Sequence, residues 1–134
     1  MRVVLDTNIF VSGIHWPGAS AQVMSAWFDD QFILVSSYPL IKEFRRILGN
    51  FKKPLSVEDM EWWENLIYER ADMVIPTRQI FAVKDDPYDD KFIEAAVEGK
   101  ADYIVTQDGH LLALKQYGTC LIVNPEEFPK KIEK

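Results

Sequence analysis

The stretch Val3-Val4-Leu5-Asp6-Thr7-Asn8 decides the fold, because a short apolar run stops abruptly at an aspartate and two further polar residues. Such a run, rich in valine and bounded by polar residues, is typical of a strand that is buried on both faces. Four more short apolar runs share this character and lie at residues 33–35, 73–75, 103–105 and 121–123. The sequence therefore predicts about five strands.

Between these runs, apolar residues recur at helical spacing, in segments at 20–29, 39–48, 56–71, 89–98 and 110–116. Local signals agree with this assignment, since Ser56 suits a helix N-cap and Gly99 a helix C-terminus. Alternation of strands and helices is typical of a parallel sheet covered on both faces. We expect an α/β fold of three layers, a twisted parallel sheet of about five strands flanked by helices.

Length and composition indicate one domain spanning residues 1–134, because 48% of the residues are hydrophobic and no repeat or Gly/Ser linker interrupts the pattern. The one cysteine, Cys120, excludes a disulfide framework and a cysteine metal site. Asp6 interrupts the N-terminal apolar run too early for a signal peptide or a membrane span. We expect a reduced, cytoplasmic protein with no membrane association.

The net charge of −6 argues against the broad basic surface of many nucleic-acid-binding proteins. Any nucleic acid would therefore have to be bound by a few local cations. The candidates are Arg45, Arg46, Lys52, Lys53, Lys91 and Lys100.

Two acids follow predicted strands directly. Asp6 closes the first strand, and Asp108 follows the fourth in Val105-Thr106-Gln107-Asp108. Ligands of parallel sheets bind beyond the carboxyl ends of the strands, so both carboxylates are expected at that edge. Asp108 also suits the N-cap of the helix that begins near His110. No helix is expected directly after Asp6, so capping explains this residue less well.

A third acid, Glu43, lies at the border of an apolar helical stripe, one turn from Leu40 and from Ile47. This position predicts partial burial, although a lone glutamate on a helix is usually solvated.

The fourth acidic element is Asp85-Asp86-Pro87-Tyr88-Asp89-Asp90, where Pro87 forces a turn before a helix. One aspartate in a first helical turn is favoured by the helix dipole alone. Asp90 and Glu94 share one helix face, where two like charges cost stability unless something positive lies between them.

Each acid taken singly has an ordinary structural explanation, but their joint placement points to chemistry. Carboxylates that converge in a dry cleft repel one another, and a bound hard cation relieves this repulsion. Oxygen ligands without cysteine or clustered histidine select Mg²⁺ or Mn²⁺.

At these residues the sequence resembles the PIN-domain family, in particular its toxin-like, VapC-related prokaryotic branch. The resemblance rests on Val4-Leu5-Asp6-Thr7-Asn8, Glu43, the segment from Asp86 to Ala96, and the segment from Ala101 to Asp108. It implies a PIN-like fold with Asp6, Glu43, Asp90 and Asp108 as the catalytic and metal-binding acids. Thr7 or Asn8, and Thr106, resemble the supporting polar residues. The family pattern of an aspartate three residues before an aliphatic one favours Asp90 over Asp89.

The resemblance further implies a Mg²⁺- or Mn²⁺-dependent endoribonuclease that hydrolyses RNA phosphodiester bonds, as the toxin of a toxin–antitoxin pair. Asp6 and Asp90 are the first choices for direct metal ligands, with Asp108 and Glu43 completing the shell directly or through water. A cognate antitoxin protein is the implied partner. The alternatives are an RNA-maturation nuclease and a non-catalytic PIN-like RNA-binding or scaffold domain.

Other residues carry weaker expectations. Trp62 and Trp63 are adjacent on a helix and cannot both face one core, so a homodimer or an antitoxin would explain the outward one, as would a loop lying over it. Residues 13–18 are expected to form a loop above the acidic edge, in which Trp16 gates the substrate. His15 and His110 are too far apart in sequence to indicate a histidine site.

Two other enzyme or signalling classes that place an aspartate after the first strand fit less well. An aspartyl phosphatase needs a second aspartate two residues on, where this chain has Asn8. A receiver domain needs an aspartate after the third strand, which here is followed by Pro76.

Overall fold

One six-stranded sheet, in the order β3-β2-β1-β4-β6-β5, organises the protein. The computed structural model describes residues 1–132. The strands are β1 (Arg2–Leu5), β2 (Ile33–Ser37), β3 (Asp72–Val74), β4 (Tyr103–Val105), β5 (Gln116–Tyr117) and β6 (Cys120–Val123). All neighbours pair in parallel except β5, which forms an antiparallel hairpin with β6. The predicted five parallel strands are confirmed, and the short edge strand β5 is an addition.

The expectation that all strands are buried on both faces is wrong at the edge of the sheet. The central strand β1 is almost fully buried, whereas β3 has only half-buried or exposed residues and ends one residue earlier than predicted. Ile75, expected inside that strand, is 83% exposed. An edge strand has a neighbour on one side alone, so its apolar residues are covered less completely.

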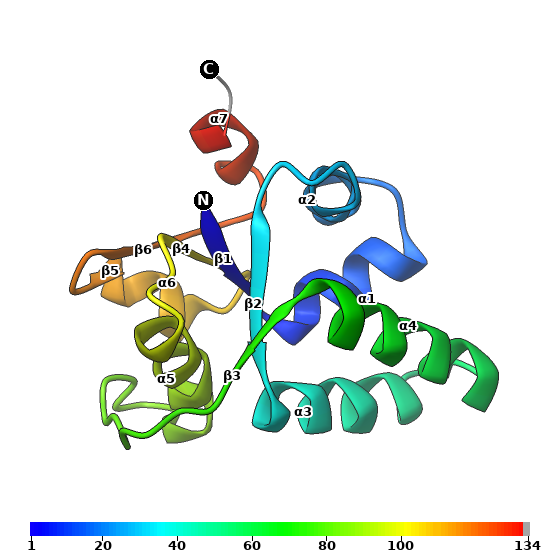
Figure 1. The fold of residues 1–134 in the computed structure, drawn as a ribbon, viewed down its shortest axis with the longest axis horizontal. Helices are drawn as coiled ribbons and strands as arrows, with labels where there is room; N and C mark the ends of the chain where they lie inside the picture. Colours follow the sequence, from blue (N-terminus) through cyan, green and yellow to red (C-terminus); the bar gives the residue numbers. More distant parts are fainter. Residues whose placement is uncertain (133–134) are drawn as a thin grey trace.

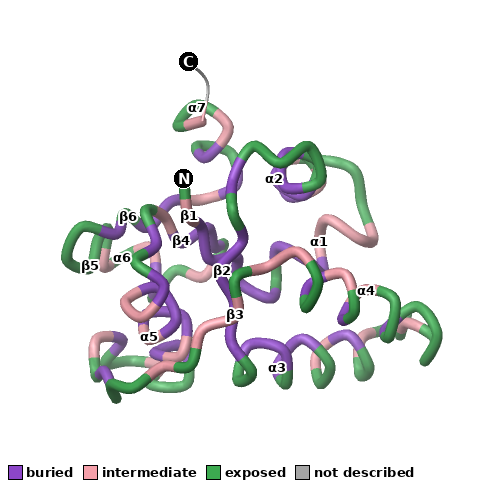
Figure 2. The backbone as a smooth tube through the Cα atoms, in the orientation of Figure 1, coloured by how far each residue is buried: buried purple, intermediate pink, exposed green. Residues whose placement is uncertain are grey.

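Helices cover both faces of the sheet and give three layers (Figure 1). One face packs against α1 (Thr7–His15), α2 (Ala19–Phe28), α3 (Tyr38–Gly49), α4 (Val57–Arg70) and α7 (Phe128–Ile132). The other face packs against α5 (Asp90–Glu98), which follows the 3-10 turn η1 (Pro87–Asp89), and α6 (Gly109–Leu114). Figure 2 shows the buried residues concentrated in the central strands and on alternating turns of α3.

Helix α1 corrects the sequence prediction, which had a loop at residues 13–18 and no helix directly after Asp6. Asp6 is the N-cap of α1, and the helix continues through Gly13 to His15 before Pro17. A Cβ at position 13 would lie 2.3 Å from Met24 Sδ, so a glycine there permits the close packing of α1 on α2. This packing explains why a glycine lies inside the helix. Glycine and proline mark loops only when packing does not require them in a helix.

The same helix places Trp16 far from the acidic edge. Nine residues of α1 separate Asp6 from Trp16, which corresponds to roughly 14 Å at the usual helical rise. Trp16 instead lies against His15 and Phe51. The expected gating role of Trp16 is therefore not supported.

The remaining helices begin and end close to their predicted bounds. The Ser56 hydroxyl accepts a hydrogen bond from the Asp59 backbone N–H, which confirms the predicted N-cap of α4. On α4 the two tryptophans divide as expected, since Trp62 is 57% exposed and Trp63 packs against the core. Within residues 1–132, no helix is long and apolar enough to cross a membrane.

Candidate active site

Asp6 and Thr106 form the centre of the carboxyl edge of the sheet. They follow the neighbouring parallel strands β1 and β4, which brings them together although they are 100 residues apart. The Thr106 hydroxyl donates to Asp6 Oδ2 at 2.6 Å and accepts from the Asp108 backbone N–H at 2.9 Å. The Thr106 hydroxyl thus holds the Asp6 side chain and the Asp108 backbone. This agrees with the supporting role that the sequence indicates.

Asp6 is 3% exposed, and burial raises the pKa of its carboxyl group from 3.8 to about 6. The hydrogen bonds from Thr106 and from the Asn8 backbone N–H oppose this shift, while the charges of Glu43 and Asp108 add to it. Asn8 thus contributes its backbone rather than its side chain, and Thr7 is buried in the first turn of α1. Both expected acids, Asp108 and Glu43, lie close enough to Asp6 to affect its charge.

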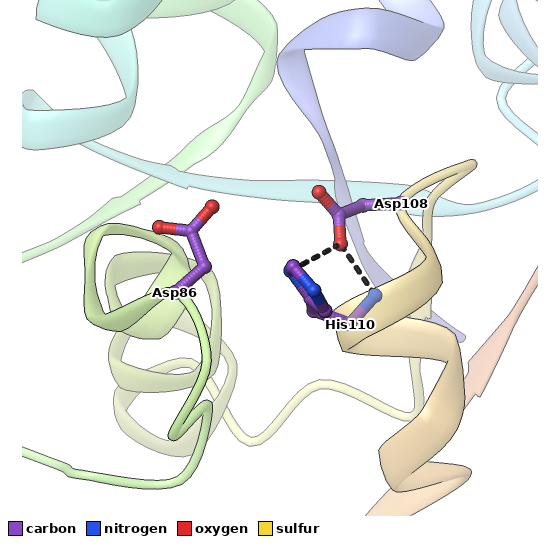
Figure 3. A group of neighbouring side chains, drawn as sticks. All are labelled: Asp86, Asp108 and His110. Carbon is purple, nitrogen blue, oxygen red and sulfur yellow. Dashed lines mark hydrogen bonds and ion pairs between the residues drawn. The ribbon is translucent and has the colours of Figure 1, made fainter.

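Asp108 serves as the N-cap of α6 and also faces a second carboxylate. Its Oδ1 accepts hydrogen bonds from the backbone N–H groups of His110 and Leu111 at 2.7 and 3.2 Å. Asp86, Asp108 and His110 each place one potential ligand atom within 4.8 Å of the others. Figure 3 shows Asp86 reaching from the loop before α5 toward Asp108 and His110 at the start of α6. Neither Asp86 nor His110 is among the site residues expected from the sequence.

The adjacent aspartates Asp89 and Asp90 have different environments. Asp90 Oδ1 accepts hydrogen bonds from the backbone N–H groups of Ala82 and Val83, at 2.9 and 2.8 Å. Glu94 Oε2 accepts in the same way from Ile80. The like charges of Asp90 and Glu94 are therefore compensated by backbone donors of the loop before α5, and no cation is needed between them.

Asp89 faces the other acids. It is 7% exposed, and Oδ2 has no hydrogen-bond donor among the described residues. Burial, then the charges of Asp108 and Asp86, raise the pKa of Asp89 from 3.8 to about 7. The carboxyl group of Asp108 also interacts with that of Asp89, and two carboxyl groups form a hydrogen bond only when one is protonated. This geometry favours Asp89 over Asp90 as the acid of the cluster.

Glu43 lies at the side of this cluster and is 7% exposed, as the border position on α3 predicts. Its Oε2 lies 3.1 Å from Lys91 Nζ, an ion pair without the geometry of a directed hydrogen bond. Of the six candidate cations, Lys91 is therefore at the site. Arg45 is not, because it forms a bidentate ion pair with Glu64 on α4.

We define the acidic cluster as Asp6, Asp86, Asp89 and Asp108, with Glu43 at its border. Carboxylates that are buried, mutually repelling and short of donors are an environment that a divalent cation stabilises. The raised pKa values and the donorless Asp89 Oδ2 thus fit a bound cation. Oxygen donors together with one imidazole are compatible with Mn²⁺ as well as with Mg²⁺.

The buried carboxylates lie at the carboxyl edge of a parallel sheet, which is where α/β proteins of this architecture bind their ligands. The PIN domain model matches residues 2–110, and the chain belongs to the PIN-domain family. Proteins of this family are generally nucleases, which supports a hydrolase acting on nucleic acid.

The chain is also similar to three individual proteins. Uncharacterized protein MJ1680 of Methanocaldococcus jannaschii is 28% identical over 145 residues, which cover 100% of this chain and 93% of that protein. Two solved structures have a similar fold, VapBC2 from Rickettsia felis bound to a promoter DNA fragment and FitAcB from Neisseria gonorrhoeae. Their TM-scores are 0.59 and 0.54 at 15% and 13% identity, and both comparisons cover 92% of this chain and 98% of the other.

Two residues of the site, Asp86 and His110, have a signal in the sequence. Asp86 stands in the acidic run before α5, and His110 stands two residues after Asp108. The sequence argues against a histidine site at His110, because His15 is distant and no typical carboxylate–histidine spacing surrounds either residue. Its proximity to Asp86 depends on how the loop before α5 folds back toward α6, which no spacing in the sequence reveals.

Proposed function

We propose that this protein is a metal-dependent endoribonuclease whose metal ligands are Asp6, Asp89 and Asp108, supported by Glu43. The observation that carries the proposal is the buried Asp89 Oδ2, which has no hydrogen-bond donor among the described residues and lies among three other acids. Such a group is costly in a folded protein unless it serves a ligand. The sequence favours Asp90 as a metal ligand. We propose Asp89 instead, because Asp90 accepts hydrogen bonds from the loop before α5.

The remaining groups would position the ligands and the strand. Thr106 holds Asp6, and the helix α6 N-terminus holds Asp108. Asp86 and His110 lie on the open side of the cluster, where they would hold water directly or extend the ligand set. When bound, Mg²⁺ or Mn²⁺ supplies activation of water and neutralisation of charge on the phosphate.

Lys91 has a distinct part in this proposal. Its ammonium group lies beside Glu43, at the margin of the cluster, and its side chain is only 12% exposed. A cation there compensates the Glu43 charge and offers a positive group to a phosphate that approaches the acids. This answers part of the objection raised by the net charge of −6.

Cleavage of RNA as the toxin of a toxin–antitoxin pair, in the cytoplasm, is the biological setting we favour. The toxin-like sequence motifs support it, and the fold is similar to those of VapBC2 and FitAcB. RNA maturation and metal-dependent RNA binding without cleavage are the competing functions. We also propose that the outward Trp62 lies in a homodimer or antitoxin interface, which sedimentation of wild-type protein and Trp62→Ala would test.

The first experiment is cleavage of end-labelled RNA by purified protein, with Mg²⁺, with Mn²⁺ and with EDTA. Asp6→Asn is the test variant, and Asp59→Asn is the matched control because Asp59 is an exposed acid in the first turn of α4. Metal-dependent cleavage that Asp6→Asn abolishes and Asp59→Asn retains is the expected result. A single-stranded DNA of the same sequence, run alongside, tests the preference for RNA.

Contrary results separate the alternatives. Metal binding with no cleavage of any RNA would favour the non-catalytic domain. Cleavage that persists in EDTA, or in Asp6→Asn, would exclude the proposed site. Cleavage confined to one structured precursor would favour RNA maturation over the toxin.

A further inference from the structure

A cleft of about 540 Å³ opens beside the acidic cluster, between the start of α3 and the turn η1. Figure 1 shows the first turns of α3 lying beside the α5 region. We name this site the tyrosine cleft, and its lining includes Tyr38, Lys42, Glu43, Arg46, Tyr88 and Lys91. Glu43, at the border of the acidic cluster, and its ion-pair partner Lys91 both line the cleft, so the cleft adjoins the cluster.

Two aromatic rings stand on the walls of the cleft. Tyr38 is 64% exposed and Tyr88 is 55% exposed, although both are large side chains beside a well-covered sheet. Lys91 Nζ lies 3.0 Å from the centroid of the Tyr88 ring and covers one of its faces, so a base that stacks on Tyr88 would use the opposite face. Exposed tyrosine rings in a charged groove are a platform on which unpaired bases stack, regardless of sequence.

Cations lie beside each ring. Lys42 Nζ is 5.9 Å from the centroid of Tyr38, and Arg46 is 5.6 Å from that of Tyr88, whose hydroxyl accepts a hydrogen bond from the Arg46 guanidinium. Within residues 1–132 neither Lys42 nor Arg46 forms an ion pair with an acid, so both remain available to an anion. In a protein of net charge −6, this local excess of cations is suited to phosphate.

We propose that the tyrosine cleft binds unpaired nucleotides of the RNA strand next to the bond that is cut, with bases on Tyr38 and Tyr88 and phosphates on Lys42 and Arg46. The proposal rests on the proposed nuclease function and adds the residues that hold the RNA strand outside the acidic cluster. Paired bases present their edges rather than their faces, so a duplex cannot use the rings. The strand would then pass Glu43 and Lys91 as it continues from the cleft to the acidic cluster.

The test is fluorescence anisotropy with a labelled 12-nucleotide single-stranded RNA, in the full-length Asp6→Asn background so that the strand stays intact. Tyr38→Ala and Tyr88→Ala should each raise the Kd by roughly 5- to 100-fold, the range for loss of one stacked base. Tyr88→Phe should retain binding, because the ring is kept. Tyr68→Ala, on the exposed part of α4, is the matched control and should bind as the parent does.

The phosphate contacts have their own readout. Lys42→Ala and Arg46→Ala should each lower the slope of log Kd against log salt concentration by about 0.7. Lys131→Ala, on the exposed side of α7, removes the same charge elsewhere and should leave the slope unchanged. Binding of a duplex of the same sequence should be indifferent to both tyrosine substitutions.

The outcomes distinguish this inference from the nuclease proposal. If wild-type protein cleaves RNA but Tyr38→Ala and Tyr88→Ala bind the single strand like the parent, the tyrosine cleft is not the strand site and the nuclease stands. If wild-type protein fails to cleave while single-strand binding still depends on both tyrosines, the cleft stands and the nuclease falls. An equal loss in Tyr68→Ala would also overturn the inference.

Discussion

The acidic cluster and the tyrosine cleft meet at Glu43 but are built on opposite principles. In the cluster, Asp6 and Asp89 are almost fully buried and their pKa values are raised to about 6 and about 7. In the cleft, Lys42 and Arg46 are exposed and lie over tyrosine rings, and hydrogen bonds from Lys91 and Arg46 lower the pKa of Tyr88. The cluster therefore strains the metal-free protein electrostatically, whereas the cleft does not.

This difference shows where metal binding and folding stability oppose each other in the molecule. Removing a charge from the cluster should relieve repulsion while destroying a metal ligand, which is the usual trade between stability and activity at a strained site. Removing a charge from the cleft should weaken a ligand contact and leave stability nearly unchanged.

The largest expected effect separates the neighbours Asp89 and Asp90. Asp89→Asn should lower kcat/KM by more than about 100-fold, because loss of a ligand exceeds the roughly 10- to 100-fold loss when a ligand's supporting hydrogen bond is removed. Asp90→Asn should stay active, since an amide oxygen still accepts from Ala82 and Val83. Steady-state cleavage of RNA measures both, and the reverse ranking would restore Asp90 as the ligand.

A smaller loss is expected when the support of Asp6 is removed. Thr106→Val deletes the hydroxyl that donates to Asp6 Oδ2, and activity should fall about 10- to 100-fold. This hydrogen bond lowers the pKa of Asp6, so its loss should raise the metal concentration needed for activity, more at pH 6 than at pH 8. Thr106→Ser keeps the donor and should restore the profile, and an unchanged metal requirement in Thr106→Val would contradict this role.

The pH dependence of folding stability measures the electrostatic strain in the acidic cluster. The pKa values of Asp6 and Asp89 are higher in the folded protein than the ordinary value of 3.8, so stability from these groups is full below pH 3.8 and is lost as the pH rises through 6 to 7. In EDTA, Asp89→Asn should melt like wild type at pH 5 but be more stable at pH 8, by on the order of 2 kcal/mol.

Thermal unfolding of both proteins across this pH range is the measurement. Addition of Mn²⁺ at pH 8 should stabilise wild type by about 2.7 kcal/mol at 100 times its Kd, and Asp89→Asn by less. A wild-type protein whose stability rises from pH 5 to pH 8 in EDTA would show that the cluster is not strained.

The smallest effect concerns Arg45, which lies next to Arg46 on α3 but outside the cleft. Arg45→Ala should leave RNA binding and its salt dependence unchanged, because its guanidinium is held by Glu64. The melting temperature should fall slightly, since Glu64 is 6% exposed and loses its partner. RNA affinity reduced as much as in Arg46→Ala would mean that the whole outer face of α3 attracts the strand rather than the tyrosine cleft alone.

Much of the fold was predictable because its signals are local. Runs such as Val3 to Leu5 and the apolar stripe of α3 identify strands and helices, and their alternation predicts a parallel sheet. Helix α1 was missed because Gly13 and Pro17 are ordinary loop signals, and the close packing on Met24 that makes Gly13 acceptable is not visible in the sequence.

The sequence by itself determined that Asp6 and Asp108 share one edge of the sheet, because parallel strands end there, and that Glu43 borders the core. Tertiary structure alone decided which of Asp89 and Asp90 faces these acids, and that Asp86, His110 and the two tyrosines join the site. The physical reason is that neighbouring residues at a helix start point in different directions. Which of the two faces the acidic cluster depends on partners from elsewhere in the chain. Here the backbone N–H groups of Ala82 and Val83 donate to Asp90, and Asp89 faces the acidic cluster.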